Sequence, residues 1–227
     1  MNIVIKNLAI LLSVFTLISP VHAMMVDDST DMCAPFKDTD IGQSSIAQML
    51  SAADRGMLYQ IDQASSKAGF CVEGPTGLVR ADFKRFNGGV ALLDNRADEI
   101  KTLMALEVDS LESDTFLVAS MLKGDTFLDA ETFPKIVFIG KSVEWVNAHK
   151  AVLKGELTMH GQTREVAFYV TLTAPRQKSY AMESISIKAS TTISRQQFGL
   201  GALADVVADR VTLCMQFEAV RYRVEYL

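Results

Sequence analysis

The stretch KAVLKGELTM, residues 150–159, alternates between apolar and polar side chains along most of its length. Its apolar and small members fall on one face and its polar members on the other: Ala151, Leu153, Gly155, Leu157 and Met159 against Lys154, Glu156 and Thr158. Because successive side chains of a β-strand point to opposite faces, this pattern predicts a strand with one buried and one solvated face. Such one-sided alternation is typical of antiparallel sheets.

Seven further segments extend this pattern along the chain. Three segments that follow it keep the period of two: 164–173, 184–194 and 210–219. Four segments that precede it are less regular: 58–73, 78–86, 100–108 and 135–143. Turn signals separate several of them, namely Gly74-Pro75, Asn87-Gly88-Gly89, Asn147 and His160-Gly161. The sequence therefore predicts an all-β domain of about eight antiparallel strands, which can form a sandwich or close into a barrel.

Two segments lack the period of two and favour helix. Apolar residues recur at near-helical spacing before Gly56, namely Ile41, Ile46, Met49, Leu50 and Ala53. We interpret this short amphipathic helix as a cover over one end of a barrel, with a lid or a partner-binding helix as the alternative. The second segment, Asp114 to Asp129, is expected to be a connection with a helical turn or two.

The first 23 residues have the three-part layout of a cleavable secretory signal. Lys6 precedes an apolar run from Leu8 to Ile18, Pro20 breaks it, and Val21-His22-Ala23 offers small residues for cleavage. The run is too short to span a hydrocarbon core of ~30 Å. We therefore expect an exported protein with a signal at 1–23, a polar leader and helix at 24–57, and one barrel domain at 58–227.

Composition argues against several classes of function. A net charge of −5 and a pI of about 5.2 give no general attraction to nucleic acid or anionic membranes. Only His149 and His160 remain after the signal, and the chain has no nucleophile elbow, metal-ligand spacing or glycine-rich phosphate loop. We expect no catalytic residues, no metal and no cofactor.

Cys71 and Cys214 are expected to point outward from the first and last strands. These strands are neighbours if the barrel closes, so one hypothesis is a disulfide, which needs Cα atoms about 4.4–6.8 Å apart. The alternative is two separate thiols beneath the N-terminal helix.

Three stretches resemble the YceI-like family: GDTFLDAETFPKIVF (124–138), LKGELTMHGQTREV (153–166) and TISRQQFGL (192–200). The opening YQIDQASSKAGFCV (59–72) and the closing DRVTLCMQFEA (209–219) fit the same pattern, so the resemblance covers about residues 58–220. It implies a periplasmic, eight-stranded lipocalin-like barrel. It also implies that a long isoprenoid chain, such as a quinone or prenyl diphosphate tail, lies in the lumen.

The inward residues would then line a ligand-binding lumen: Phe70, Phe83, Phe127, Phe133, Phe138, Leu157, Phe168, Ile187, Met215 and Phe217. Alternation alone favours a filled core; the resemblance favours a lumen left partly empty by small inward residues such as Gly155. The segment from Gly124 to Pro134 is expected either to gate the mouth or to plug it. Arg195 is expected to hold its turn through a salt bridge or backbone contacts rather than to contact a head group.

The sequence thus favours a binding module, a carrier or sequestering protein for an isoprenoid-type lipid or quinone. Two alternatives stay open. One is an accessory protein whose N-terminal helix docks a membrane redox protein, and the other is an enzyme that acts on an amphipathic substrate. A homodimer is compatible with either.

Overall fold

The computed structural model describes residues 43–92, 100–174 and 183–222. The expected signal and most of the leader therefore lie outside the described residues. The described elements are α1 (Gln43–Asp54), β1 (Leu58–Ile61), β2 (Lys67–Gly74), β3 (Gly77–Phe83), β4 (Phe86–Leu92), β5 (Ile100–Glu107), β6 (Leu111–Ser113), α2 (Phe116–Lys123), β7 (Lys135–Trp145), β8 (Lys150–Met159), β9 (Gln162–Leu172), β10 (Ser184–Ser194) and β11 (Arg210–Arg221). Short 3₁₀ turns follow β1, β5 and β10.

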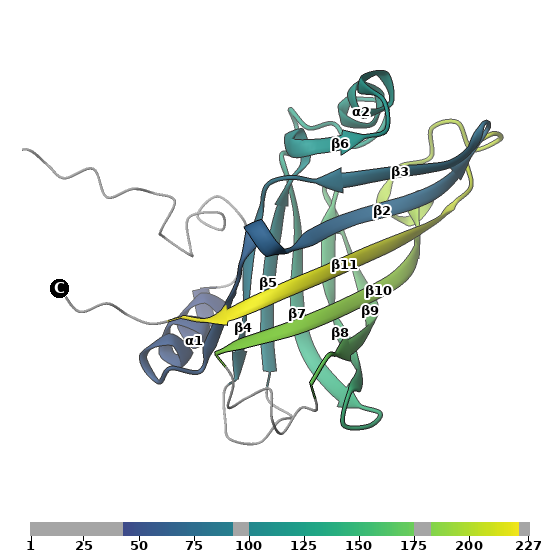
Figure 1. Ribbon diagram of the computed structural model, residues 1–227. Coiled ribbons are helices and arrows are strands. Elements are labelled where there is room, and N and C mark those ends of the chain that lie inside the picture. The colour runs from purple at the N-terminus through teal and green to yellow at the C-terminus, as the bar shows by residue number, and fades with distance from the viewer. Residues whose placement is uncertain (1–42, 93–99, 175–182, 223–227) are drawn as a thin grey trace, which may run out of the picture. The chain divides into compact units, whose positions relative to one another are not determined.

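The strands of this region form one antiparallel sheet that closes on itself (Figure 1). Three pairs of consecutive strands, β1 with β2, β3 with β4 and β5 with β6, behave as single bent strands. Strands β1 and β2 both pair with β11, β4 and β3 continue on their other side, and β5 and β6 pair in turn with β4 and β3. Strand β11 closes the circle by pairing with β1, where Tyr59 lies opposite Arg221, and with β2. The result is the expected eight-stranded antiparallel barrel, and the three bends account for the strands beyond eight.

Helix α1 packs on the outside of the barrel wall, which corrects the expectation that it covers one end. Its buried residues Met49, Ala52 and Ala53 contact the outward side chains of β4, β5 and β7: Ala91, Leu103, Ala105 and Val137. These strands are therefore apolar on both faces, inward to the lumen and outward to α1. Burial on both faces explains why the segments 100–108 and 135–143 alternate less regularly than the later ones.

Asn87-Gly88-Gly89 lies inside strand β4, so the interpretation of these residues as a turn was wrong. A Cβ atom added to Gly88 would lie 2.5 Å from the carbonyl oxygen of Leu103, and one added to Gly89 would lie 2.8 Å from that of Tyr59. The glycines are needed for close approach of neighbouring backbones rather than for a reversal of the chain. The other turn signals are confirmed, including His160-Gly161, where both residues have positive φ angles of 49° and 68°.

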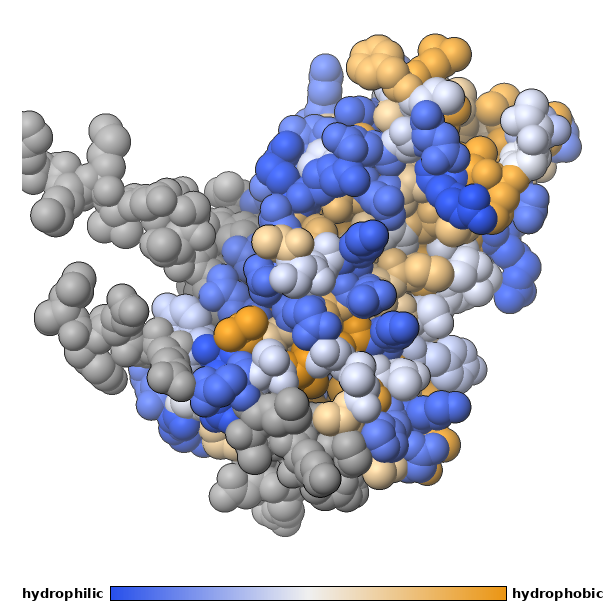
Figure 2. All heavy atoms as spheres, in the orientation of Figure 1, coloured by the Kyte–Doolittle hydropathy of each residue, from blue (hydrophilic) through white to orange (hydrophobic). Residues whose placement is uncertain are grey.

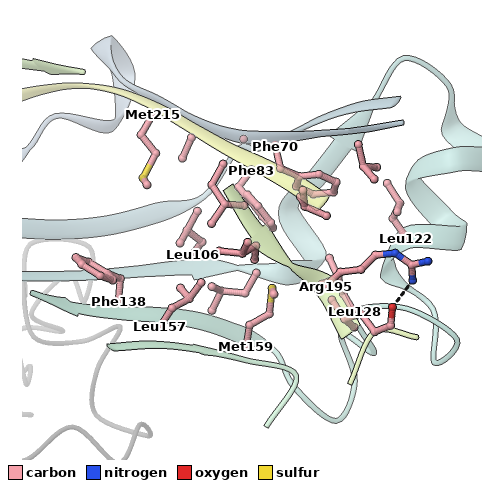
Figure 3. A pocket seen from close by; sticks show the side chains of 18 of the residues that line it. Phe70, Phe83, Leu106, Leu122, Leu128, Phe138, Leu157, Met159, Arg195 and Met215 are labelled. Carbon is pink, nitrogen blue, oxygen red and sulfur yellow. Dashed lines mark hydrogen bonds between the residues drawn. The ribbon is translucent and has the colours of Figure 1, made fainter. Parts of the chain in front are cut away.

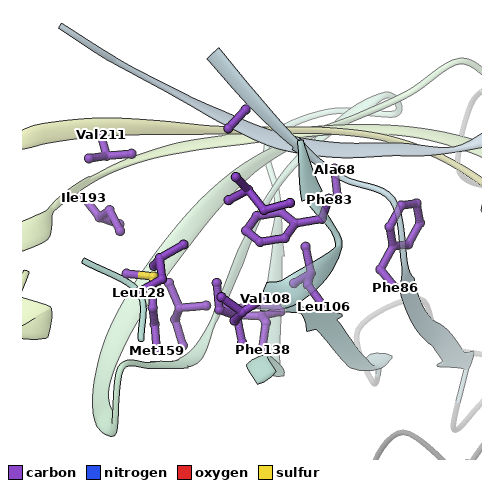
Figure 4. Close-up of a cluster of buried hydrophobic side chains, with 14 of the residues drawn as sticks. Ala68, Phe83, Phe86, Leu106, Val108, Leu128, Phe138, Met159, Ile193 and Val211 are labelled. Carbon is purple, nitrogen blue, oxygen red and sulfur yellow. The ribbon is translucent and has the colours of Figure 1, made fainter. Parts of the chain in front are cut away.

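One end of the barrel is covered by connections instead of strands. Helix α2 and the residues that follow it place Leu122, Phe127 and Leu128 in the main apolar core, and the segment after β10 adds Phe198 and Leu200. Figure 4 shows one of these residues, Leu128, beside Met159. The helical connection expected between Asp114 and Asp129 is confirmed as α2. Within the described part of the chain, no helix is long and apolar enough to cross a membrane.

Gly155 on β8 provides a test of the packing inside the barrel. A Cβ atom there would lie 2.7 Å from Cζ of Phe138 and closer still to the carbonyl oxygen of Ile139. We expect Gly155→Ala to lower the free energy of unfolding by about 1–3 kcal/mol through overpacking. Chemical denaturation measures this change. Gly201→Ala is the control, because nothing lies within 4 Å of its added Cβ, and an equal effect of both substitutions would contradict the packing described.

Candidate ligand-binding lumen

The interior of the barrel contains two cavities of about 100 Å³ each. A cavity needs only ~10–15 Å³ on this measure to hold one water molecule, so both are large internal spaces. Nearly all of the surface that lines them is apolar. Such a space favours an apolar guest, because a water molecule there would find too few hydrogen-bond partners.

The first cavity lies at the end covered by α2 and the connection after β10 (Figure 3). Its wall combines inward residues of the strands with three residues of the α2 connection: Leu122, Phe127 and Leu128. The second cavity is lined by inward residues of β4, β5 and β7–β11, among them Trp145, Ile185 and Phe217. The α2 connection therefore closes the first cavity and takes no part in the second.

The structure brings nine of the ten predicted lumen residues to the cavity walls. The first cavity takes Phe70, Phe83, Phe127 and Leu157, the second takes Ile187 and Phe217, and Phe138, Phe168 and Met215 line both. Phe133 is the exception: its ring packs edge-on against His160, with 4.7 Å between ring centroids, and lines neither cavity. Phe133 was predicted from the aromatic-rich segment 124–134 and not from alternation, and the structure places it outside the walls of these two cavities.

Several lining residues were not singled out from the sequence. Leu122, Leu128 and Val207 come from connections, which carry no alternation that would indicate an inward face. Trp145 is the last residue of β7, two positions beyond the end expected for that strand. A longer strand 135–145 would have placed it on the same face as Val143.

Arg195 is the one ionisable residue among those that line the two cavities. Its side chain is only 4% exposed and donates hydrogen bonds to four backbone carbonyl oxygens of the following connection: Leu200, Ala202 at 2.8 Å, Val207 at 2.9 Å and Ala208 at 3.0 Å. Backbone contacts, one of the two roles expected for it, are thus confirmed. A hydrogen bond from Ser194 and another from the Gln196 N–H lower the pKa of nearby Asp209.

Cys71 and Cys214 lie on neighbouring strands as expected, but both are free thiols in the structure. Cys71 is opposite Thr212 and Cys214 is opposite Gly69, so the cysteines form a diagonal pair. Diagonal pairs have Cα atoms about 7–8 Å apart, beyond the usual span of a disulfide. This separation explains why no disulfide joins them. The alternative, two separate thiols beneath the N-terminal helix, is also corrected, because α1 lies over β4, β5 and β7. Burial, and to a lesser extent Cys71, raises the pKa of Cys214.

A polar groove of about 650 Å³ lies on the outer wall where β9 and β10 separate. Their ladder stops at Tyr169 opposite Ser190, although both strands continue. The groove is lined mainly by polar and charged residues, including Arg164, Glu165 and Arg210. It differs in chemistry from the lumen and offers no apolar enclosure. No group of three or more potential metal ligands occurs among the described residues.

A closed antiparallel barrel with an apolar, partly empty lumen defines a class of proteins that hold small apolar ligands inside a β-barrel. Residues 59–219 match the model of the YceI-like domain, and the chain belongs to this family.

The relatives include a UPF0312 protein of Shewanella oneidensis, 25% identical over 80% of this chain and 95% of its own length. A UPF0312 protein of Pseudomonas putida is 27% identical over 54% of this chain, and the match spans 64% of its length. Among solved structures, BcnA of Burkholderia cenocepacia has a TM-score of 0.64 at 21% identity, covering 70% of this chain and 99% of BcnA.

A polyisoprenoid-binding domain from Saccharophagus degradans has a TM-score of 0.57 at 12% identity, covering 72% of this chain and 98% of that domain. At these identities the structural likeness concerns the fold.

Arg195→Met should show how strongly this side chain holds the connection that covers the first cavity. The substitution keeps an apolar stem and leaves four carbonyl oxygens without their donor, so we expect a loss of about 2–4 kcal/mol in the free energy of unfolding. Denaturant unfolding of Arg195→Met and of the exposed control Arg164→Met measures this. The control should change stability by no more than about 0.5 kcal/mol, and comparable losses would contradict the role of Arg195.

Proposed function

We propose that this protein binds an isoprenoid-type lipid, such as a quinone or another prenyl-chain molecule, inside the barrel, as a carrier or sequestering protein. The observation that carries this proposal is the pair of apolar cavities inside the barrel. Membership of the YceI-like family and the fold shared with a polyisoprenoid-binding domain support it.

The energetics of the lumen favour such a ligand. Removing apolar surface from water contributes roughly 25 cal/mol per Å², and a prenyl chain offers such surface along its whole length. The wall of the first cavity contains three methionines, Met104, Met159 and Met215, whose unbranched side chains adapt to irregular guests. A polar ligand would gain little there, because the one ionisable group, Arg195, already donates to four carbonyl oxygens.

A binding role agrees with the wall chemistry better than catalysis does. General acid–base or nucleophilic chemistry requires titratable groups that face the bound substrate. In the described lumen the sole ionisable side chain is Arg195. We further propose that the protein acts in the periplasm; support for this comes from the secretory signal expected at residues 1–23, which lie outside the described part of the chain.

The single tryptophan of the chain provides a direct test, since Trp145 lines the second cavity. We expect a prenylated quinone to quench its fluorescence saturably at an equimolar end point, because the ligand enters the lumen. The same quinone head group without its tail should quench only in proportion to its concentration. Fluorescence titration measures both, and equal saturable quenching by the tail-less compound would contradict binding through the tail.

A matched pair of substitutions on β11 distinguishes ligand binding in the lumen from binding on the outer face. Met215 lines both cavities, whereas its neighbour Gln216 is exposed. Met215→Gln should weaken binding of the prenylated quinone about tenfold or more, because the amide loses hydrogen bonds to water when the ligand covers it. Gln216→Met should leave the affinity unchanged. The reverse order of effects would place the ligand outside the barrel.

A further inference from the structure

Four residues contribute to the walls of both cavities and stand between them. They are Met104 of β5, Phe138 of β7, Phe168 of β9 and Met215 of β11, and we refer to these four as the constriction. They come from strands distributed around the barrel, so the constriction surrounds the lumen instead of lining one side. In Figure 3, Phe138 and Met215 lie at one end of the first cavity, whereas Leu122, Leu128 and Arg195 lie at the other.

The aromatic half of the constriction is rigidly packed. The rings of Phe138 and Phe168 meet nearly edge to face, with 5.0 Å between their centroids and 74° between their planes. Both side chains are buried, with 5% and 1% exposure. Phe138 also lies directly over Gly155, whose missing side chain makes room for the ring. Because interiors are close-packed, neither ring can move far without displacing its neighbours.

The methionine half of the constriction can yield more easily. Met104 and Met215 have unbranched side chains with three rotatable bonds, which re-pack at low cost around a guest. Met215 is only partly buried and packs against the main core from β11, which is separated from β9 by β10. A chain that passes from one cavity to the other must therefore displace methionine side chains past a fixed aromatic pair.

We propose that the constriction determines which lengths of prenyl chain the protein holds, with the Phe138–Phe168 pair as its specificity-determining element. This inference rests on the proposed function and adds a length preference to it. A chain short enough for one cavity binds without disturbing the constriction. A longer chain has to open it, so the gain in affinity with each added isoprene unit falls once one cavity is full.

The experiment measures affinity as a function of chain length. Geranyl, farnesyl, geranylgeranyl and solanesyl alcohols compete with a prenylated quinone for the full-length protein, with Trp145 fluorescence as the readout. For the unmodified protein, we expect the affinity to rise with length and then level off. Phe138→Leu should remove the plateau and raise the affinity for the longest alcohol about tenfold relative to that for geranyl alcohol, as expected for burying about two further methylene groups.

Two further variants test the same inference in case the Phe138→Leu protein does not fold. Phe168→Leu removes the other ring of the same pair and carries the same expectation. Met215→Phe narrows the constriction and should weaken binding of the longest alcohol more than that of geranyl alcohol. Phe133→Leu is the matched control, because it removes the same kind of ring from a site that lines neither cavity, and it should leave the length profile unchanged.

The outcomes separate this inference from the proposed function. If all folded variants bind prenyl alcohols with one and the same length profile, the constriction does not select chain length, and the lipid-binding function stands. If the folded, unmodified protein binds none of the alcohols and no prenylated quinone, the proposed function fails, and the length selection fails with it.

Discussion

A sheet with one apolar face has to bury that face, and in this chain closure of the sheet accomplishes the burial. Strand β11 pairs with β1 at one end of its length and with β2 at the other, so the last strand joins the first. The bends between β1 and β2, β3 and β4, and β5 and β6 let eight strands turn around the axis without breaking their ladders. The lumen, its lining and its covered end all follow from this closure.

Closure alone would permit a filled core, and the residues at the axis decide how much space remains. Small residues such as Gly155, Ala151 and Ala189 alternate with large aromatics, and one aromatic, Phe138, occupies the room that Gly155 leaves. Cavities lower stability, because the atoms around them lose packing partners.

The outer surface of α2 is apolar as well. Phe116 and Leu117 of α2 are largely exposed, and Figure 2 shows hydrophobic residues at this end of the molecule. The helix that closes the first cavity is thus apolar on more than its inner face.

Much of the barrel could be predicted from the sequence because alternation reports directly on which face of a strand is buried. The regular strands β8 to β11 and eight of the lumen residues follow from it, whereas Phe127 lies in the connection after α2. Prediction failed where other constraints act. Helix α1 covers the outer wall and buries the outward residues Leu103 and Val137, and Asn87-Gly88-Gly89 allows close backbone contact inside a strand. Phe133 and the diagonal register of Cys71 and Cys214 depend on connections and pairings that no local pattern encodes. The four carbonyl acceptors of Arg195 likewise depend on the path of the connection after β10.

The proposed function requires an apolar lumen that a prenyl chain can occupy along the barrel axis. A crystal structure of the protein with a bound prenylated quinone tests this most directly. We expect continuous electron density for the tail inside the barrel, beginning in one of the two cavities and in contact with Phe138 or Met215. Density for the ligand in the polar groove between β9 and β10, with both cavities unchanged, would contradict it.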